Sequence, residues 1–161
     1  MDYFIRFYAE LEDINPTWIA AILTKEISTL DPADALQDKG LWRGDPTIGY
    51  AQSNIGRSRK NEGILREKGL LSRNYLYDGK TDDEIRGILL DKDKSPHVVA
   101  IQLKAVYLNN VVDTYTDPKE IITNTFAIYN NSAQRDEYGE KAYRYYEIWE
   151  WYYAELAKLT P

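Results

Sequence analysis

Three prolines that directly follow a helix-capping residue restrict the fold of this sequence more than any other feature. An Asn, Ser or Asp side chain before a helix accepts a hydrogen bond from an N–H of the first turn. Proline fits the first helical position, because the N–H that it lacks would have no partner there. The pairs are Asn15-Pro16, Ser95-Pro96 and Asp117-Pro118, and they predict helices over residues 17–28, 97 to about 115, and 119 to about 129.

Other signals predict three more helices. Thr81 precedes three acidic residues, which the positive end of a helix dipole favours in the first turn. Residues 136–159 carry aromatic and apolar side chains at steps of three and four, which predicts a long closing helix with one face on the core. Residues 2–11 are expected to form a short helix. The chain is therefore expected to be mostly α-helical, and α+β at most.

The segment between residues 30 and 55 lacks this periodicity. Proline and glycine interrupt it at five positions, namely Pro32, Gly40, Gly44, Pro46 and Gly49. We expect a long irregular loop here, or a small β-hairpin near residues 42–50, since loops of this length in compact domains usually serve a function. No internal repeat or linker follows, so residues 1–161 are expected to form a single domain.

Charge and composition exclude several classes of function. The chain has 26 acidic and 20 basic residues, a net charge of −6 and no basic stripe, so nucleic acid is not expected as a partner. It has no cysteine and one histidine, His97, so we expect no metal and no cofactor. Neither a signal peptide nor an apolar stretch of about 18 residues is recognisable, so no membrane span is expected.

Aromatic side chains with a polar group are unusually frequent, with 14 Tyr and 4 Trp against 3 Phe. Such rings suit a hydrated groove, where one part contacts a ligand and the other forms a hydrogen bond. The rim of a hydrophobic core is the alternative location for each of them.

Glu26 is the first candidate for chemistry. It lies on the same helical face as Ile19, Ile22 and Leu23. A carboxyl group on an apolar face loses hydration, which raises its pKa by up to roughly 3–5 for a fully buried group. A glutamic acid that stays protonated near neutral pH can serve as a general acid. Alternatively, the end of this helix faces solvent, or a basic side chain neutralises the carboxylate.

Three short motifs resemble the lysozyme-like superfamily, and in particular goose-type lysozymes and soluble lytic transglycosylases. In that superfamily a helix ends in a catalytic Glu, often followed by Ser; here Glu26 matches and the serine is displaced to Ser28. The family's Gly-Leu-Met-Gln turn resembles residues 49–52, with Gly49 and Gln52 matching, preceded by Trp42 and a glycine-flanked Asp45.

The third motif is the family's Ala-Tyr-Asn-Ala-Gly, which resembles residues 128–132, with Tyr129 and Asn130 matching. The helix before it, with Tyr107 and Leu108 followed by Asp113, is similar to the corresponding helix of the transglycosylases. The resemblance covers roughly residues 15–150, and it implies a lysozyme-like helical domain in which the irregular loop or hairpin lines a cleft.

The resemblance also implies an activity. Glu26 would protonate the β-1,4 glycosidic oxygen between N-acetylmuramic acid and N-acetylglucosamine in peptidoglycan. Asp45 would be the second carboxylate of a hydrolase, although Asp in a Gly-Asp-Pro stretch is also a common turn residue. Asn54 stands near a position where goose-type enzymes carry Asp, and this departure favours transglycosylation, which needs no second acid. Substrate-binding positions would be Trp42, Tyr50, Gln52, Tyr129 and Asn130.

Tyr129 has two interpretations at this stage. Its phenol could hold the carboxyl group of Glu26, or it could bond a backbone carbonyl at the end of a helix. A structure separates these alternatives directly.

A second hypothesis is a catalytically inactive lysozyme-like binding or structural/interaction protein, such as an immunity or structural component, whose aromatic helix segment 143–153 forms a partner surface. The acidic charge and the missing signal peptide favour it, because a secreted wall-degrading enzyme more often carries a signal peptide and basic residues. A phage lysozyme, an injected effector or a toxin domain needs neither a signal peptide nor basic residues, and a lysozyme-like fold alone does not imply catalysis. In the enzyme hypothesis the partners are peptidoglycan glycan strands and a cognate inhibitor or immunity protein. The protein would act at the cell wall after delivery by a non-classical route, and otherwise in the cytoplasm.

Overall fold

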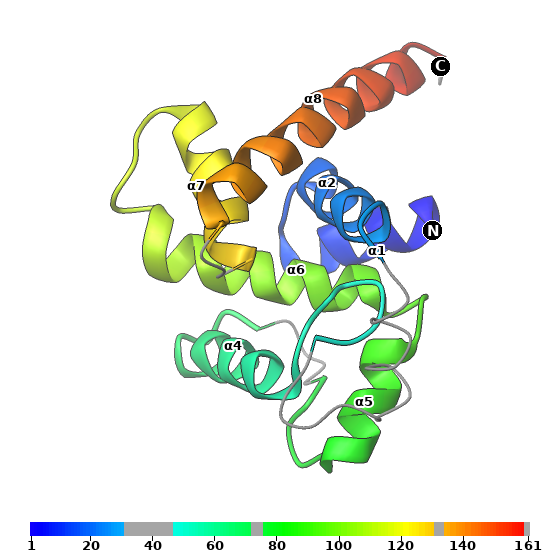
Figure 1. Cartoon of the computed structure of the whole chain (residues 1–161), viewed down its shortest axis with the longest axis vertical. Coiled ribbons are helices and arrows are strands. Elements are labelled where there is room, and N and C mark those ends of the chain that lie inside the picture. The colour runs from blue at the N-terminus through cyan, green and yellow to red at the C-terminus, as the bar shows by residue number, and fades with distance from the viewer. Residues whose placement is uncertain (31–46, 72–75, 131–133, 160–161) are drawn as a thin grey trace.

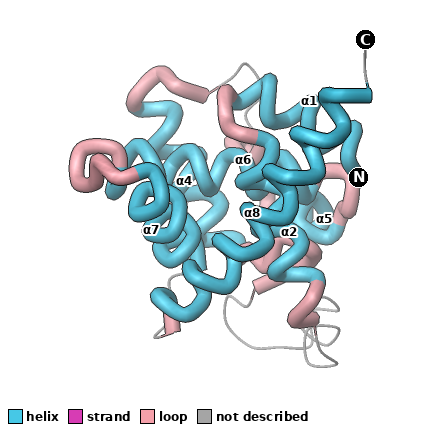
Figure 2. Tube along the Cα trace, turned by 90° about the horizontal axis from the view of Figure 1, so that it is seen from above, coloured by secondary structure: helices cyan, strands magenta, loops and turns pink. Residues whose placement is uncertain are grey.

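The structure is a computed structural model, and it describes residues 1–30, 47–71, 76–130 and 134–159. Seven α-helices and one π-helical turn account for most of these residues (Figure 1). The elements are α1 (Asp2–Glu12), α2 (Pro16–Ile27), α4 (Ile55–Glu67), α5 (Asp82–Leu90), α6 (Ser95–Val106), the π-helical turn η1 (Tyr107–Val111), α7 (Pro118–Asn130) and α8 (Arg135–Leu159). No strand occurs within these ranges (Figure 2). The expectation of a mostly α-helical fold is confirmed.

Most of the predicted helix starts are formed as the capping signals indicated. The Asn15 side chain accepts a hydrogen bond from the N–H of Thr17 at 2.8 Å, and Asp117 accepts one from Glu120 at 3.0 Å. Thr81 and Glu84 cap each other's backbone N–H groups at the start of α5. Ser95 differs, because it is already helical and its hydroxyl donates to the carbonyl of Asp91 at 3.1 Å. The predicted cap at this position is therefore wrong, although the helix exists.

Helix α6 is the centre of the fold. All but one of its residues are buried, and it contacts α1, α2, α4, α5 and α7. Figure 1 shows α4 and α5 on one side of α6 and α1, α2, α7 and α8 on the other. The predicted helix over 97 to about 115 is shorter, since α6 ends at Val106 and continues as η1.

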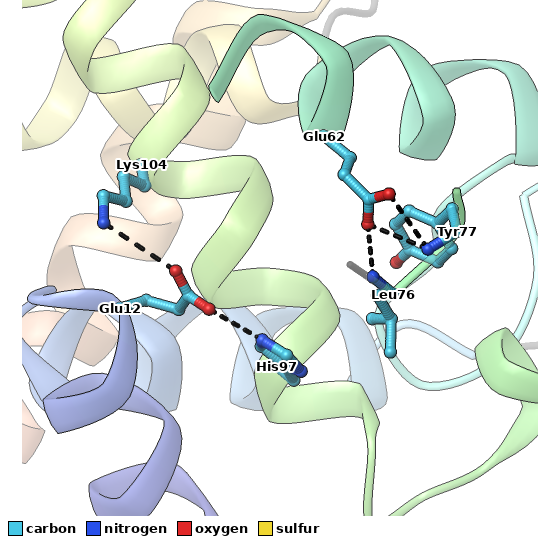
Figure 3. Close-up of polar contacts among 6 residues, drawn as sticks. All are labelled: Glu12, Glu62, Leu76, Tyr77, His97 and Lys104. Carbon is cyan, nitrogen blue, oxygen red and sulfur yellow. Dashed lines mark hydrogen bonds and ion pairs between the residues drawn. The ribbon is translucent and has the colours of Figure 1, made fainter. Parts of the chain in front are cut away.

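Two buried carboxylates connect neighbouring elements on opposite sides of α6 (Figure 3). Glu12 of α1 lies 2.8 Å from His97 and 3.7 Å from Lys104, both on α6. Glu62 of α4 accepts hydrogen bonds from the backbone N–H groups of Leu76 and Tyr77, the shortest at 2.6 Å and 2.8 Å respectively. Buried charges are retained when they are paired in this way, so these contacts fix α1 and α4 against their neighbours.

Helix α8 packs on α2 and α7. Tyr138 and Ala142 are buried, and Trp149 donates from its indole N–H to the Thr24 hydroxyl at 2.9 Å. Tyr152 is 40% exposed, so the face predicted to pack on the core does so only up to about Trp149. The remainder of α8 contacts α1 through Tyr153, whose phenol donates to Asp2 Oδ1 at 2.9 Å.

The contact between α1 and α8 is expected to weaken in acid. Partial burial raises the pKa of Asp2, but hydrogen bonds from Arg6 and Tyr153 outweigh it and hold the pKa below the ordinary value of 3.8. A lowered pKa stabilises the fold above the unfolded-state pKa, and this stability is lost as the pH falls through the folded-state value. The difference in Tm between wild type and Asp2→Asn should be present at about pH 6 and shrink as the pH falls below the ordinary Asp pKa of about 3.9. A difference that persists unchanged to pH 2 would contradict this assignment.

Candidate active site

Glu26 lies at the penultimate position of α2 and is only 6% exposed. Tyr138, at the start of α8, donates a hydrogen bond from its hydroxyl to Glu26 Oε1. The Nζ of Lys25 lies 4.8 Å from the centre of the Tyr138 ring, so a cation lies against this phenol. The alternative in which the end of this helix turns Glu26 to solvent is therefore wrong.

Two buried tyrosines interact electrostatically with this carboxyl group, and both are held in the protonated form. Burial, and next the negative charge of Glu26, raise the pKa of Tyr138 and of Tyr129 well above the ordinary value of 10.0. Arg57 lowers both pKa values by a smaller amount. Each phenol is thus a hydrogen-bond donor at neutral pH, which matches the donor role that each has in the structure.

The turn of residues 48–53 lies beside Tyr129. An antiparallel bridge closes it, with Ile48 N–H to Ser53 O at 2.8 Å and Ser53 N–H to Ile48 O at 3.3 Å. Tyr129 donates from its hydroxyl to the carbonyl of Ala51 at 2.6 Å. This is the second of the two interpretations of Tyr129, and the phenol that contacts Glu26 is Tyr138. The bridge begins at Ile48, inside the region 42–50 where we expected a hairpin, and most of that region lies outside the described residues.

The Gln52 side chain is engaged within the same turn. Its Nε2 donates to the carbonyl of Gly49 at 2.9 Å, and its Oε1 accepts from the Thr47 hydroxyl at 2.9 Å. Gln52 also has a positive φ of 43°. The amide therefore stabilises the turn in this structure, while Tyr50 at the tip is 37% exposed.

Asn130 follows Tyr129 at the end of α7, and its side-chain oxygen is buried without a hydrogen-bond partner among the described residues. It lines a cavity of about 160 Å³ together with Lys25, Tyr138, Gln134, Glu137 and Lys141. A buried acceptor without a partner is uncommon in folded proteins, so this oxygen is available to a ligand donor.

The structure thus brings together Glu26, the 49–52 turn and Tyr129, and it adds Tyr138 and Arg57, which the sequence analysis did not assign to the site. Arg57 donates from Nη1 to the carbonyl of Tyr129 at 2.9 Å, which ties α4 to the end of α7. Tyr138 belongs to the segment 136–159, which was predicted only as a closing helix with one face on the core. The predicted positions Trp42 and Asp45 lie outside the described residues.

Replacing Tyr138 by phenylalanine is expected to lower the free energy of unfolding by about 1–3 kcal/mol, because a buried carboxyl group loses a hydrogen-bond donor. Tyr145→Phe is a matched control on the same helix, since its hydroxyl makes only a long 3.4 Å contact with Ser28. The control should change stability by less than about 0.5 kcal/mol. Urea denaturation at pH 7 measures both, and equal stabilities for the two variants would argue against the Tyr138–Glu26 contact.

Two further kinds of feature, metal-ligand clusters and membrane-spanning helices, can be assessed in the part of the chain that the structure describes. In these ranges no three His, Asp or Glu side chains gather closely enough to hold a metal ion. None of the helices described combines the length and apolar character that crossing a bilayer requires.

Comparison of the chain with protein-family models, with curated proteins and with solved structures finds no match. A hypothesis about function therefore depends on the geometry of the site and on the three motifs.

Proposed function

We propose that this protein is a peptidoglycan-cleaving glycosidase, either a muramidase or a lytic transglycosylase, with Glu26 as the general acid. The observation that supports the proposal most is the arrangement of the three motifs. They are separated in the sequence, yet Tyr129 contacts the Ala51 carbonyl of the second motif at 2.6 Å, and the charge of Glu26 acts on Tyr129. A lysozyme-like fold would require this proximity.

The surroundings of Glu26 suit proton donation. Burial favours the neutral form of a carboxyl group, and the Tyr138 hydroxyl, which donates to Oε1, can donate to either protonation state of Glu26. In protonated Glu26, Oε1 would be the carbonyl oxygen that accepts from Tyr138, and Oε2 would carry the proton. Transfer of that proton to the glycosidic oxygen breaks the bond to the leaving sugar. The side chain of Asn130 would hold a sugar hydroxyl or amide through its buried oxygen.

The second half of the reaction distinguishes two enzymes. A hydrolase needs a carboxylate to activate water, for which Asp45 remains the candidate, whereas a transglycosylase lets a hydroxyl of the sugar attack. Asn54 caps α4, accepting from the Arg57 N–H at 2.7 Å, and an amide cannot act as a base. We therefore favour transglycosylation.

Incubation of purified peptidoglycan with wild type and with Glu26→Gln tests the proposal. Fragments released by wild type alone would support it, and fragments lighter by one water at the muramic end would identify a transglycosylase. The absence of any release by the folded wild-type protein from several wall types would overturn it.

A binding protein without catalysis is the second candidate. The exposed apolar side chains on the outer face of α8 favour it, since Ile148 is 58% and Trp151 65% exposed. Such surfaces often contact partner proteins. In that case Glu26→Gln should leave the affinity for the partner unchanged, while Trp151→Ala should weaken it.

A further inference from the structure

A cavity of about 480 Å³ lies between α4, α6 and the end of α7. This volume is within the range of small-ligand sites, roughly 300–1,000 Å³. Its lining includes Arg57, Lys60, Asn61, Gln102, Asn109 and Tyr129. Tyr129 thus belongs to the wall of this cavity and also interacts electrostatically with Glu26.

The charge of this cavity is opposite to that of the protein. The described residues that line it include two cations, Arg57 and Lys60, and no acid, in a chain of net charge −6. The two cations are three residues apart on α4, so they lie on neighbouring positions of one helical face. Arg57 uses Nη1 for the Tyr129 carbonyl, and a guanidinium has five N–H donors in total. The cavity therefore favours an anionic group.

The floor of the cavity offers an acceptor. Gln102 of α6 is 1% exposed, and its Oε1 is buried without a partner among the described residues. Its Nε2 donates to the Ser53 hydroxyl, which lies 2.9 Å from the Ser58 hydroxyl, and this pairing fixes the orientation of the amide. A buried acceptor of this kind is satisfied by an N–H or O–H, either of an ordered water or of a ligand that displaces the water.

We propose that this cavity binds a peptide carboxylate, and that its source is the peptide carried by the glycan strands. An amide N–H beside a carboxylate meets both requirements, since the N–H satisfies Gln102 and the carboxylate meets Arg57 and Lys60. A neutral sugar leaves both cations unused, and inorganic phosphate, which could also donate one proton to Gln102, is tested as a competitor below. This inference rests on the proposed function for the identity of the ligand.

Binding of small probes tests the inference without any cleavage. The probes are N-acetyl-alanyl-glutamate, the same dipeptide with both carboxyl groups amidated, and muramyl dipeptide, each titrated into the full chain by isothermal calorimetry or NMR. We expect the acidic dipeptide to bind roughly ten-fold more tightly than its diamide, and added salt to weaken it. Muramyl dipeptide should bind at least as tightly as the free dipeptide if the glycan is the source.

Two variants locate the site. Lys60→Gln should weaken the acidic dipeptide roughly five-fold, because Lys60 is exposed and its charge is partly screened. Lys68→Gln is the matched control at the end of the same helix, outside the cavity lining, and it should leave affinity unchanged. Gln102→Leu should weaken binding roughly ten-fold, with its circular dichroism melt checked against wild type.

Three results would overturn the inference: equal binding of dipeptide and diamide, equal effects of Lys60→Gln and Lys68→Gln, or displacement of the dipeptide by an equal concentration of inorganic phosphate. Failure of the proposed glycosidase function would give a different experimental result from failure of this inference. A protein that binds the dipeptide through Lys60 but releases no wall fragments has this peptide site without the glycosidase activity.

Discussion

Glu26→Gln is expected to reduce the rate of glycan-fragment release by a factor of about 10²–10⁴, the usual contribution of a general acid. The glutamine amide has the size of the carboxyl group, and its oxygen can accept the Tyr138 hydrogen bond, so the surroundings of residue 26 should persist. What is lost is the proton that the leaving sugar oxygen requires. The rate of appearance of soluble muropeptides, measured by mass spectrometry, gives the factor.

A buried glutamate elsewhere is the appropriate control. Glu12 is 0% exposed and pairs with His97 and Lys104 of α6, so Glu12→Gln also neutralises a buried carboxylate. Its rate, normalised to the folded fraction, should equal that of wild type. A wild-type rate in Glu26→Gln would exclude Glu26 as the acid. A loss in both variants that disappears on normalisation to the folded fraction would mean that Glu26 contributes to folding and not to catalysis.

The helices that the sequence predicted well are those whose capping groups are local. Asn15, Thr81 and Asp117 each bond an N–H two or three residues ahead, so neighbouring residues contain the whole signal. Helix α4 was not predicted for the opposite reason. Its buried positions follow helical spacing, but three of the five are polar: Ser58, Asn61 and Glu62. Apolar periodicity therefore could not reveal this helix.

The residues of the candidate site also divide into those that a local sequence pattern predicts and those whose contacts depend on the tertiary fold. Glu26 on an apolar face was predicted from a local pattern, and its burial follows from that face packing on the core. The Tyr138–Glu26 hydrogen bond joins residues 112 positions apart, and nothing near Tyr138 distinguishes it from the other tyrosines of α8. Tyr129 was identified through its motif, but the choice between Glu26 and a backbone carbonyl as its partner depends on how α7 meets the 48–53 turn.

Gly49→Ala is expected to be the most destabilising of these substitutions, because two separate penalties add. Gly49 has a φ of +66°, where an L-residue with a Cβ costs about 1–2 kcal/mol. A Cβ at this position would also lie 1.9 Å from the carbonyl oxygen of Leu89, a backbone atom at the end of α5 that cannot rotate away. Overpacking of this kind adds about 1–3 kcal/mol. We expect a total loss of about 2–5 kcal/mol in the free energy of unfolding.

Gly69→Ala separates the two penalties. Gly69 has nearly the same φ, +67°, but a Cβ added there would meet no neighbouring atom within 4 Å, so this variant should lose only the conformational part. The difference between the two variants in urea denaturation measures the contact between the 48–53 turn and α5. Equal losses would mean that α5 does not pack on this turn. A larger loss in Gly49→Ala would explain why the turn has glycine at position 49. The Leu89 carbonyl occupies the space that a side chain would need there, so the turn that places Ala51 against Tyr129 can form only if residue 49 has no side chain.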